Sequence, residues 1–276
     1  MININGRILE REKTGLAIDN RAFRFGDSLF ESIRVSGGRP LFMEDHFSRL
    51  IRGMKDFKME NSRQWDLSSF RQEVLKVIEA NHFIGGGRLR FTIFRQGEGL
   101  YAPSGNDIGY TVDLTSGLPD SFELNGDGFL IGTFSDWPLS ANKYSRYKTN
   151  NCLPYITAGL YARDNGFDDV LILNTDGNIS EAVSSNVFMS IEGILYTPPL
   201  SDACVAGIMR KKVIQLSRKL KIAVVESSLS PNMLEKADEV ILSNAISGLR
   251  WAGSYEKKRY FHKLSVRLTE ALNQLL

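Results

Sequence analysis

Alternating and helical patterns of apolar residues divide the first half of the chain into strands and two helices. Apolar residues three or four positions apart predict helices at 44–57 and 67–81. Asn5-Gly6 and Gly37-Gly38 are turn signals, because such pairs favour the left-handed backbone of tight hairpins. Alternating and β-branched segments predict strands at 2–9, 30–35, 88–94 and 110–114.

The second half of the chain also contains both strands and helices, in no regular order. Its predicted strands occupy 129–133, 170–173, 186–190, 194–197 and 240–242. Its predicted helices occupy 157–165, 207–220 and 264–275. Because strands and helices do not alternate as βαβ units, the pattern favours an α+β fold over a doubly wound sheet.

Residues 115–128 interrupt the pattern with a segment rich in Gly, Pro, Ser and Asp. Such a composition is typical of a loop or linker. We therefore expect an N-terminal α+β domain at 1–114, a linker at 115–128 and a C-terminal α+β domain at 129–276. A chain of 276 residues is long enough for two domains with their own cores.

Composition narrows the possible partners. The net charge is +2 and the basic residues are scattered, which gives no reason to expect nucleic acid as a partner. Cys152 and Cys204 are far apart and the three histidines are isolated, so neither a disulfide framework nor a metal site is expected. No apolar run is long enough for a membrane span, and no signal peptide is visible at the N-terminus. We expect a cytoplasmic protein without a membrane partner.

Residues 174–188, NTDGNISEAVSSNVF, contain the most informative carboxylate of the chain. Glu181 lies between a strand-like run and a small polar loop that includes Ser185 and Asn186. One carboxylate followed by several neutral donors suits a cofactor that needs a single anionic partner. The alternative is a β-hairpin that turns at Asp176-Gly177 and leaves the glutamate exposed.

Lys148 lies in the polar segment 146–151 and is the candidate nucleophile. A lysine amine can form a Schiff base, provided that burial or a nearby positive charge lowers its pKa. Arg146 would supply some of that charge. The alternative is an exposed surface lysine, the commonest state of this residue type.

Two segments predict a seat for an anion. Small residues before the helix at 207–220 leave the N–H groups of Gly207, Ile208 and Met209 without partners in the helix, and such groups bind phosphate. Ser243-Asn244 follows a strand as a polar turn, a common position for ligand contacts. The alternatives are an ordinary helix start and a plain turn.

Arginines supply further candidates. Arg49 falls on the apolar face of its predicted helix, where its planar fork would suit a phosphate or carboxylate. The alternative is a salt bridge with Asp45 one turn away. Arg88 and Arg90 share one face of a predicted strand, and a bound anion would relieve their repulsion. The alternative is that both lie on the solvated face of an edge strand.

These candidates together suggest one cofactor. A phosphate seat, an amine nucleophile and one carboxylate are the three contacts that pyridoxal phosphate needs.

Six motifs, in their order along the chain, resemble the class IV aminotransferases, which are fold-type IV pyridoxal-phosphate enzymes. These motifs are RAFRFGDSLFESIRV, MEDHFSRL, YKTNN, GNISEAVSSNVF, LYTPP and AGIMR. The resemblance covers nearly the whole chain. It implies a D-amino acid aminotransferase-like α+β architecture of two domains with the cofactor between them. It also implies a homodimer in which the partner supplies part of the substrate pocket.

The same resemblance assigns roles by position. Lys148 would carry the cofactor as a Schiff base and shuttle the proton, and Glu181 would pair with the pyridine nitrogen. Phosphate and ring contacts would come from the remaining cofactor-binding positions, which are Arg49, Ser185, Asn186, Gly207, Ile208, Met209, Ser243 and Asn244.

Several positions bear on which member of the family this chain resembles. Leu153 stands where the branched-chain type usually has a tyrosine. Phe30 stands where the D-amino acid type has a tyrosine, and the loop at 98–107 lacks the Arg and His of that type. Met209 in GIMR and the segment that contains Arg90 are similar to the aminodeoxychorismate lyases.

The resemblance therefore favours a lyase of folate biosynthesis that releases pyruvate from 4-amino-4-deoxychorismate and forms p-aminobenzoate. Arg90, Arg34 or Arg24 would bind a substrate carboxylate, with Phe30 in the same pocket. The alternative is an aminotransferase for D-amino or branched-chain L-amino acids with 2-oxoglutarate as acceptor. A non-enzymatic binding protein on the same scaffold is the third possibility.

Overall fold

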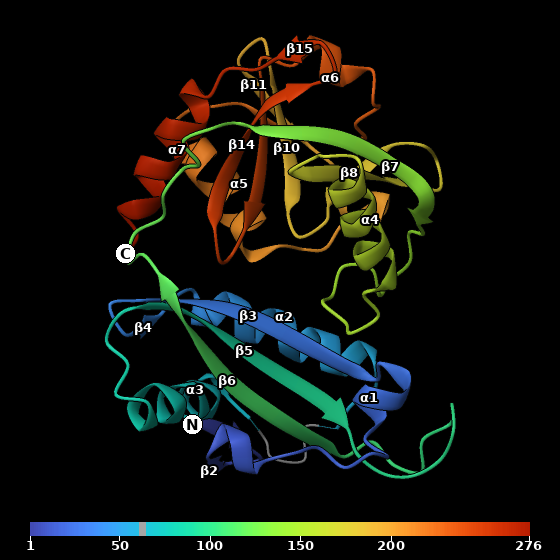
Figure 1. The fold of residues 1–276 in the computed structure, drawn as a ribbon, viewed down its shortest axis with the longest axis vertical. Coiled ribbons are helices and arrows are strands. Elements are labelled where there is room, and N and C mark those ends of the chain that lie inside the picture. Colours follow the sequence, from blue (N-terminus) through green and yellow to red (C-terminus); the bar gives the residue numbers. More distant parts are fainter. Residues whose placement is uncertain (61–64) are drawn as a thin grey trace. The chain divides into compact units, whose positions relative to one another are not determined.

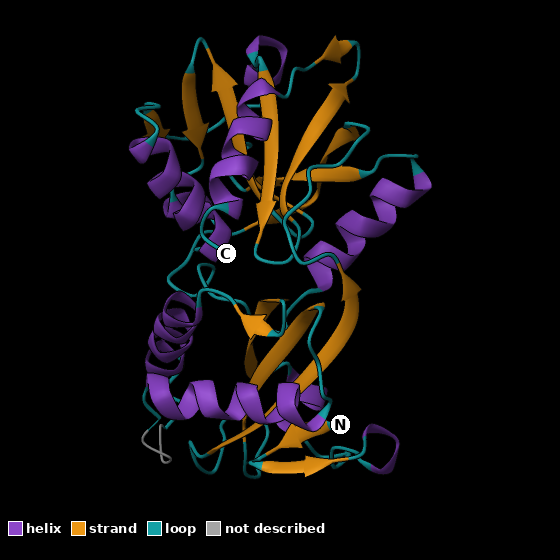
Figure 2. Ribbon diagram, turned by 90° about the vertical axis from the view of Figure 1, so that its left-hand side faces the viewer, coloured by secondary structure: helices purple, strands orange, loops and turns teal. Residues whose placement is uncertain are grey.

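The computed structural model describes residues 1–60 and 65–276, which form two compact units. The first unit contains residues 1–121 and 147–151, and the second contains 122–146 and 152–276. Both units combine helices with a β-sheet (Figure 1, Figure 2). The predicted α+β class is confirmed. Within the described ranges, no helix is long and apolar enough to cross a membrane.

The first unit is built on a six-stranded sheet in the order β2-β1-β6-β5-β3-β4, with every neighbouring pair antiparallel. Its strands are β1 (Ile2–Ile4), β2 (Arg7–Leu9), β3 (Ser28–Ser36), β4 (Arg39–Pro40), β5 (Gly86–Arg95) and β6 (Ile108–Leu118). Its helical segments are η1 (Arg11–Lys13), α1 (Arg21–Phe25), α2 (Met43–Asp56) and α3 (Leu67–Ala80). Asn5 and Gly6 have φ of 53° and 92°, as the predicted hairpin turn requires.

Helices α2 and α3 pack on one face of this sheet (Figure 1). The strand alternation of β3 turns Leu29, Glu31 and Ile33 toward the helices, and turns Phe30 to the other face. The register of β3 and β5 sets Phe30 opposite Thr92, two pairs away from Ser32 and Arg90. The side chains of Phe30 and Arg90 therefore share the face that these helices do not cover.

Residues 147–151 join the first unit although their neighbours in sequence belong to the second. Thr149 forms an isolated antiparallel bridge with Leu29, and the N–H of Phe30 donates to the carbonyl oxygen of Lys148 at 2.9 Å. The Tyr147 hydroxyl donates to Asp56 Oδ2 at 2.6 Å. These bonds hold the backbone around Lys148 against strand β3 and the end of helix α2.

The second unit contains a nine-stranded sheet in the order β12-β11-β10-β13-β14-β7-β8-β9, with β15 paired to β14. Its strands are β7 (Phe129–Leu139), β8 (Asp169–Asn174), β9 (Ile179–Ala182), β10 (Asn186–Ile191), β11 (Ile194–Thr197), β12 (Val224–Glu226), β13 (Glu239–Asn244), β14 (Gly248–Tyr255) and β15 (Lys258–Arg259). Its helical segments are α4 (Leu153–Asp164), η2 (Leu200–Asp202), α5 (Ile208–Lys219), α6 (Met233–Lys236) and α7 (Lys263–Asn273). Helix α4 packs beside β7 and β8, and α5 packs with α7 (Figure 1).

The linker prediction needs correction. Strand β6 continues through residues 115–118, because they pair with the start of β5, and the units divide between Ser121 and Phe122. Gly86 permits this pairing, since a Cβ there would lie 2.1 Å from the carbonyl oxygen of Leu118. The linker expected at 115–128 therefore begins inside a strand, and the domain expected at 1–114 also gains residues 147–151.

Helix α4 also differs from its prediction. It begins at Leu153, four residues before the expected start at 157. Pro154 lies in its first turn, where a proline needs no hydrogen-bond partner for its nitrogen and its fixed φ suits a helix. The earlier start places Tyr155 in the first turn of the helix.

Candidate active site

Glu181 is the buried carboxylate of the second unit, with only 3% of its surface exposed. The predicted hairpin between β8 and β9 is present, and Gly177 in its turn has a φ of +77°. The exposed glutamate that accompanied this alternative is excluded, because β9 is buried along its whole length. The structure therefore contains both the hairpin and a buried carboxylate.

Neutral donors surround the Glu181 carboxylate. The backbone N–H of Val205 donates to Oε2 at 3.1 Å, and the side-chain amide of Asn186 lies 3.5 Å from the same oxygen. The Tyr155 hydroxyl donates to Oε1 at 2.6 Å. Asn186 was predicted from sequence, whereas Tyr155 was missed, because the helix was expected to begin after it. Pro154 was the signal that could have placed it.

The charge of Glu181 also affects the pKa of Cys204, whose side chain is buried with 1% of its surface exposed. Burial, followed by the nearby Glu181 carboxylate, raises the pKa of Cys204 to about 12. Cys204 therefore stays a neutral thiol beside the site.

Asn186 links the carboxylate to the start of helix α5. Its side-chain amide donates to the carbonyl oxygen of Val205 at 2.8 Å, and a Cβ on Gly207 would lie 1.9 Å from its Oδ1. In the part of the chain that the structure describes, no side chain caps helix α5 at Gly207. The N–H groups of Ile208 and Met209 have no partner within the helix, as in every first turn. The helix start and the carboxylate thus belong to one cluster.

Ser243 and Asn244 join the same cluster from strand β13. Ser243 lies directly opposite Asn186 in the antiparallel register, so both side chains point to one face of the sheet. The Ser243 hydroxyl is buried and has no hydrogen-bond partner within residues 1–60 and 65–276. The Asn244 amide donates to Ser185 Oγ at 3.1 Å. Eight of the nine predicted cofactor contacts, all except Arg49, are therefore brought together.

Lys148 lies in the first unit beside an aromatic ring. Its Nζ is 5.2 Å from the centre of the Phe30 ring. The guanidinium carbon of Arg90 lies 3.7 Å from the same centre. Arg90 is fixed by two bonds, from Nη2 to Asn150 Oδ1 at 2.8 Å and from Nε to Thr92 Oγ1 at 3.2 Å. Lys148, Phe30 and Arg90, predicted separately, are thus neighbours.

The other two arginines proposed for the substrate differ from Arg90. Arg34 is 3% exposed, and its Nη2 donates to the carbonyl oxygens of Pro119 and Ser121. It therefore fastens the end of the first unit to strand β3. Arg24 is exposed on α1, with its guanidinium carbon 5.3 Å from the Phe25 ring.

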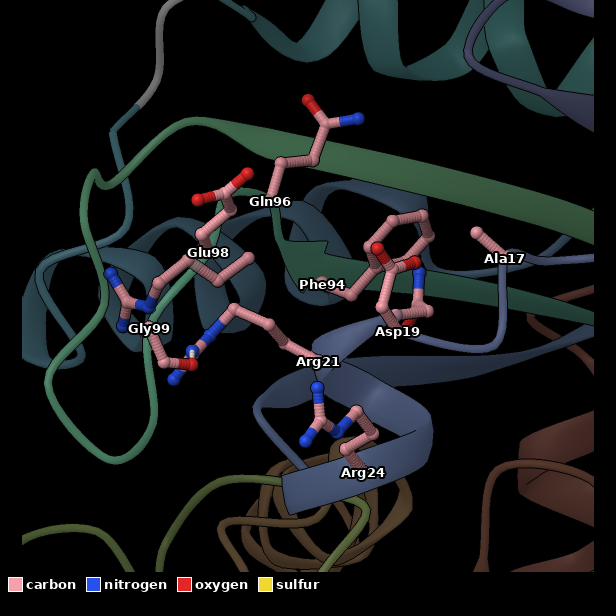
Figure 3. Close-up of a pocket in the computed structure, with 11 residues that line it drawn as sticks. Ala17, Asp19, Arg21, Arg24, Phe94, Gln96, Glu98 and Gly99 are labelled. Atoms are coloured by element: carbon pink, nitrogen blue, oxygen red, sulfur yellow. Dashed lines mark hydrogen bonds between the residues drawn. The ribbon is translucent and has the colours of Figure 1, made fainter.

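Arg24 lines a cavity of about 440 Å³ between residues 17–24 and 94–99 (Figure 3). Asp19 and Glu98 line the same cavity. Arg21 and Arg95 in its wall both bind Asp27 Oδ2, at 2.9 and 3.0 Å. Because carboxylates already neutralise much of this positive charge, the cavity is less suited than the Arg90 surroundings to bind a substrate carboxylate.

Arg49 is buried against Glu31 rather than facing an open seat. Its Nε donates to Glu31 Oε1 at 2.8 Å, and its Nη2 donates to Oε2. His46 Nδ1 lies 2.6 Å from the same Oε2. Burial alone would raise the pKa of Glu31, but the Arg49 charge and these hydrogen bonds lower it to about 2. The phosphate role of Arg49 stays a prediction, and two of its nitrogen atoms are already bonded to a carboxylate.

Comparison with known proteins identifies the family. Residues 28–254 match the family model described as amino-transferase class IV. Because this match covers most of the chain, the chain belongs to the class IV aminotransferases. It is an enzyme of the pyridoxal-phosphate-dependent kind that this family comprises. The third possibility raised from sequence, a non-enzymatic binding protein, is therefore set aside.

Individual relatives carry different activities. The D-alanine aminotransferase of Bacillus licheniformis is 25% identical over 250 residues, covering 87% of this chain and 83% of that protein. The branched-chain-amino-acid aminotransferase of Escherichia coli K12 is 28% identical over 252 residues, covering 87% and 79%. A Legionella pneumophila structure assigned as a 4-amino-4-deoxychorismate lyase is 25% identical with a TM-score of 0.87, covering 96% of this chain and 97% of that one.

The residues of the second unit fit the cofactor of this family. Glu181 offers one buried carboxylate for a protonated ring nitrogen, and its surroundings supply neutral donors. The Ser243 hydroxyl, which is buried and has no partner among the described residues, offers a donor for a phosphate. The N–H groups at the start of helix α5 offer further donors. The site thus has the donor set that pyridoxal phosphate requires.

Proposed function

We propose that the enzyme is a 4-amino-4-deoxychorismate lyase, which releases pyruvate and forms p-aminobenzoate. The observation that carries the proposal is the cluster of Lys148, Phe30 and Arg90 in the first unit. It sets a cation and a flat apolar ring beside the amine that would carry the cofactor. A substrate with a six-membered ring and a carboxylate matches these two contacts.

Two sequence features of the site support the lyase over the aminotransferases. Met209, which is buried, replaces the threonine that many aminotransferases have in this turn. The phosphate then relies on backbone N–H groups and on Ser243. Leu153 is 62% exposed at the start of α4 and cannot donate a hydrogen bond where the branched-chain type has a tyrosine.

Bound pyridoxal phosphate would supply an electron sink for the carbon that bears the substrate amine. The Lys148 amine would remove the proton from that carbon. The bond between the neighbouring carbon and the enolpyruvyl oxygen then breaks, and the proton ends on the leaving group, which becomes pyruvate. Arg90 would hold a substrate carboxylate, and Glu181 would hold the proton at the ring nitrogen.

The direct test is incubation of the purified holoenzyme with enzymatically prepared 4-amino-4-deoxychorismate. We expect p-aminobenzoate and pyruvate in equal amounts without any oxo-acid acceptor, and no product with the Lys148→Ala variant. Absence of both products at micromolar enzyme would contradict the lyase proposal.

The second candidate is an aminotransferase for D-amino or branched-chain L-amino acids with 2-oxoglutarate. The observation in its favour is the similarity to the two aminotransferases described above. Its distinguishing result is loss of the visible cofactor band when an amino acid is added alone, followed by recovery with 2-oxoglutarate. A lyase needs no such acceptor.

We also propose that two copies of the chain associate through an apolar patch of the first unit. Its side chains, 49–90% exposed, are Leu16, Ile18, Phe23, Leu100 and Tyr101. These residues lie in two segments, 16–23 and 100–101. Arg21 joins the segments, because its Nη1 donates to the carbonyl oxygens of Gly99 and Leu100 at 2.9 Å. Exposed apolar side chains gathered on neighbouring segments are typical of a protein–protein interface.

A further inference from the structure

A short hydrogen bond joins the Tyr155 hydroxyl to the Glu181 carboxylate. The hydroxyl lies 2.6 Å from Oε1, against 3.1 Å for the Val205 N–H on Oε2. O–H···O⁻ bonds of this length are charge-assisted and stronger than bonds between neutral groups. The bond also joins helix α4 to strand β9, two elements separated by β8 in the chain.

Tyr155 acts only as a donor in this pair. Burial first, and then the charge of Glu181, raise the pKa of the Tyr155 hydroxyl well above its usual range. The hydroxyl therefore keeps its proton at every pH at which the protein works. A donor that is always neutral stabilises the ionised carboxylate and lowers its affinity for a proton.

We propose that Tyr155 is a positioning residue for the cofactor, acting through Glu181. The proposal rests on the function proposed above, in which Glu181 pairs with the ring nitrogen. By lowering the basicity of the carboxylate, Tyr155 keeps the shared proton on the ring nitrogen instead of on Glu181. A positively charged ring nitrogen withdraws electrons from the reacting carbon, so Tyr155 supports the chemistry without touching the substrate.

A purely structural role for Tyr155 makes a different prediction. If the hydroxyl served only to fasten α4, its loss would lower the thermal midpoint of the protein and leave the cofactor's titration unchanged. The visible absorption band of the holoenzyme separates the two roles. With less positive charge on the ring nitrogen, the imine to Lys148 keeps its proton to higher pH, and the midpoint of the band titration rises.

The test compares Tyr155→Phe with Tyr161→Phe, a control on the same helix whose ring packs against Phe134 and Phe167. We expect Tyr155→Phe to weaken pyridoxal-phosphate binding about tenfold, in line with loss of one hydrogen bond to a charged group. The midpoint of its band titration should move to higher pH, while Tyr161→Phe matches the wild type. In a Glu181→Gln background, Tyr155→Phe should add little, because the charge on which it acts is gone.

Equal behaviour of the two tyrosine variants in affinity and band titration would overturn the proposal. A lower thermal midpoint in Tyr155→Phe, without any change in the titration of the visible band, would also overturn the proposal. If Glu181→Gln itself leaves cofactor affinity and the band unchanged, the proposed role of Glu181 fails first. If Glu181→Gln alters both and Tyr155→Phe alters neither, only the inference about Tyr155 fails.

Discussion

Arg90 lies over the ring of Phe30, with its guanidinium carbon 3.7 Å from the ring centre. Asn150, two residues after Lys148, accepts a bond from Arg90 Nη2 at 2.8 Å and so fixes the orientation of the guanidinium group. A cation stacked on an aromatic ring and held by an amide is pre-organised to receive a carboxylate. Lys148 and Arg90 are therefore linked by one ring and one short stretch of backbone.

Replacing Arg90 tests this arrangement. We expect Arg90→Gln to raise KM for a carboxylate substrate by about tenfold or more with a smaller change in kcat, because it removes binding shared by ground and transition states. Arg88→Gln is the matched control, since Arg88 is exposed on the same strand and face. Steady-state kinetics decide the matter, and equal KM values for the two variants would contradict a substrate role for Arg90.

The buried pair of Glu31 and Arg49 should dominate the acid stability of the first unit. The pKa of Glu31 is lowered from 4.5 to about 2, which corresponds to about 3 kcal/mol of stability at neutral pH. A carboxylate with a depressed pKa in the folded state stabilises above its unfolded pKa. That stability is lost as the pH falls from about 4.5 toward 2.

We therefore expect Glu31→Gln to destabilise the protein by about 3 kcal/mol at pH 7, with the difference from wild type shrinking below pH 4.5. Urea denaturation at several pH values measures this. Glu44→Gln is the control, because Glu44 pairs with Arg71 at 2.7 Å on the surface and should change stability by less than about 1 kcal/mol. A pH-independent effect of Glu31→Gln would contradict the assignment.

Self-association is expected to depend on the exposed apolar patch. Tyr101 is 90% exposed, and its ring lies 5.9 Å from that of Phe25 at the border of the patch. We expect a dimer for the wild type and a shift toward monomer for the double variant Ile18→Lys, Tyr101→Lys in sedimentation velocity. Tyr144→Lys, at an exposed position of the second unit, should leave the dimer intact. A monomeric wild type would contradict the proposed interface.

Much of the fold followed from local patterns. Turns such as Asn5-Gly6, and helices with a clear apolar face such as 67–81, were predicted correctly because their causes lie within a few residues. The attachment of residues 147–151 to strand β3 was not predicted, because it depends on pairing between segments more than a hundred residues apart. The missed start of α4 was a local error, since Pro154 was visible in the sequence.

The sequence predicted which residues line the candidate site, but not which of them bond to one another. Glu181, Asn186 and Ser243 were identified by residue type and position, and the structure brings them together. Tyr155 and Glu31 were missed, since their roles arise from contacts across elements. A carboxylate at an apolar-facing strand position, as Glu31 is, was the one signal that could have predicted a buried partner for Arg49.

Because of Asp169, the second unit should be more stable in mild acid than at neutral pH. Burial is the main cause that raises the pKa of this carboxyl to about 6. A carboxyl whose pKa is raised binds its proton more tightly in the folded state, so stability falls as the pH rises from about 3.8 to 6. Its Oδ1 accepts the N–H groups of Val170 and Val183, and an asparagine oxygen can accept the same bonds.

We expect Asp169→Asn to stabilise the protein by about 3 kcal/mol at pH 7 and to have little effect below pH 4. Thermal unfolding across this pH range measures the difference. Asp168→Asn serves as control, because Asp168 is exposed and also accepts a backbone N–H, that of Leu130 at 2.8 Å. A destabilising effect of Asp169→Asn at neutral pH would show that the charge itself is needed there.

Gly207 is expected to be important for cofactor binding, although its backbone conformation is one that any residue can adopt. Its φ of −64° and ψ of 138° are open to any residue, so an alanine would fail only through contact. The added Cβ would lie 1.9 Å from Asn186 Oδ1 and force that side chain away from Val205 and Glu181. We expect Gly207→Ala to weaken pyridoxal-phosphate binding about tenfold or more, measured by fluorescence titration of the apoenzyme.

Gly159→Ala in helix α4 is the matched control for this substitution. A Cβ at Gly159 would lie 3.6 Å from Val183 Cγ1, an ordinary contact, and alanine favours a helix over glycine by about 1 kcal/mol. This variant should therefore bind the cofactor as the wild type does and unfold at a slightly higher temperature. If Gly207→Ala also bound normally, Asn186 could move without cost, and its contacts with Val205 and Glu181 would not be needed to hold the cofactor.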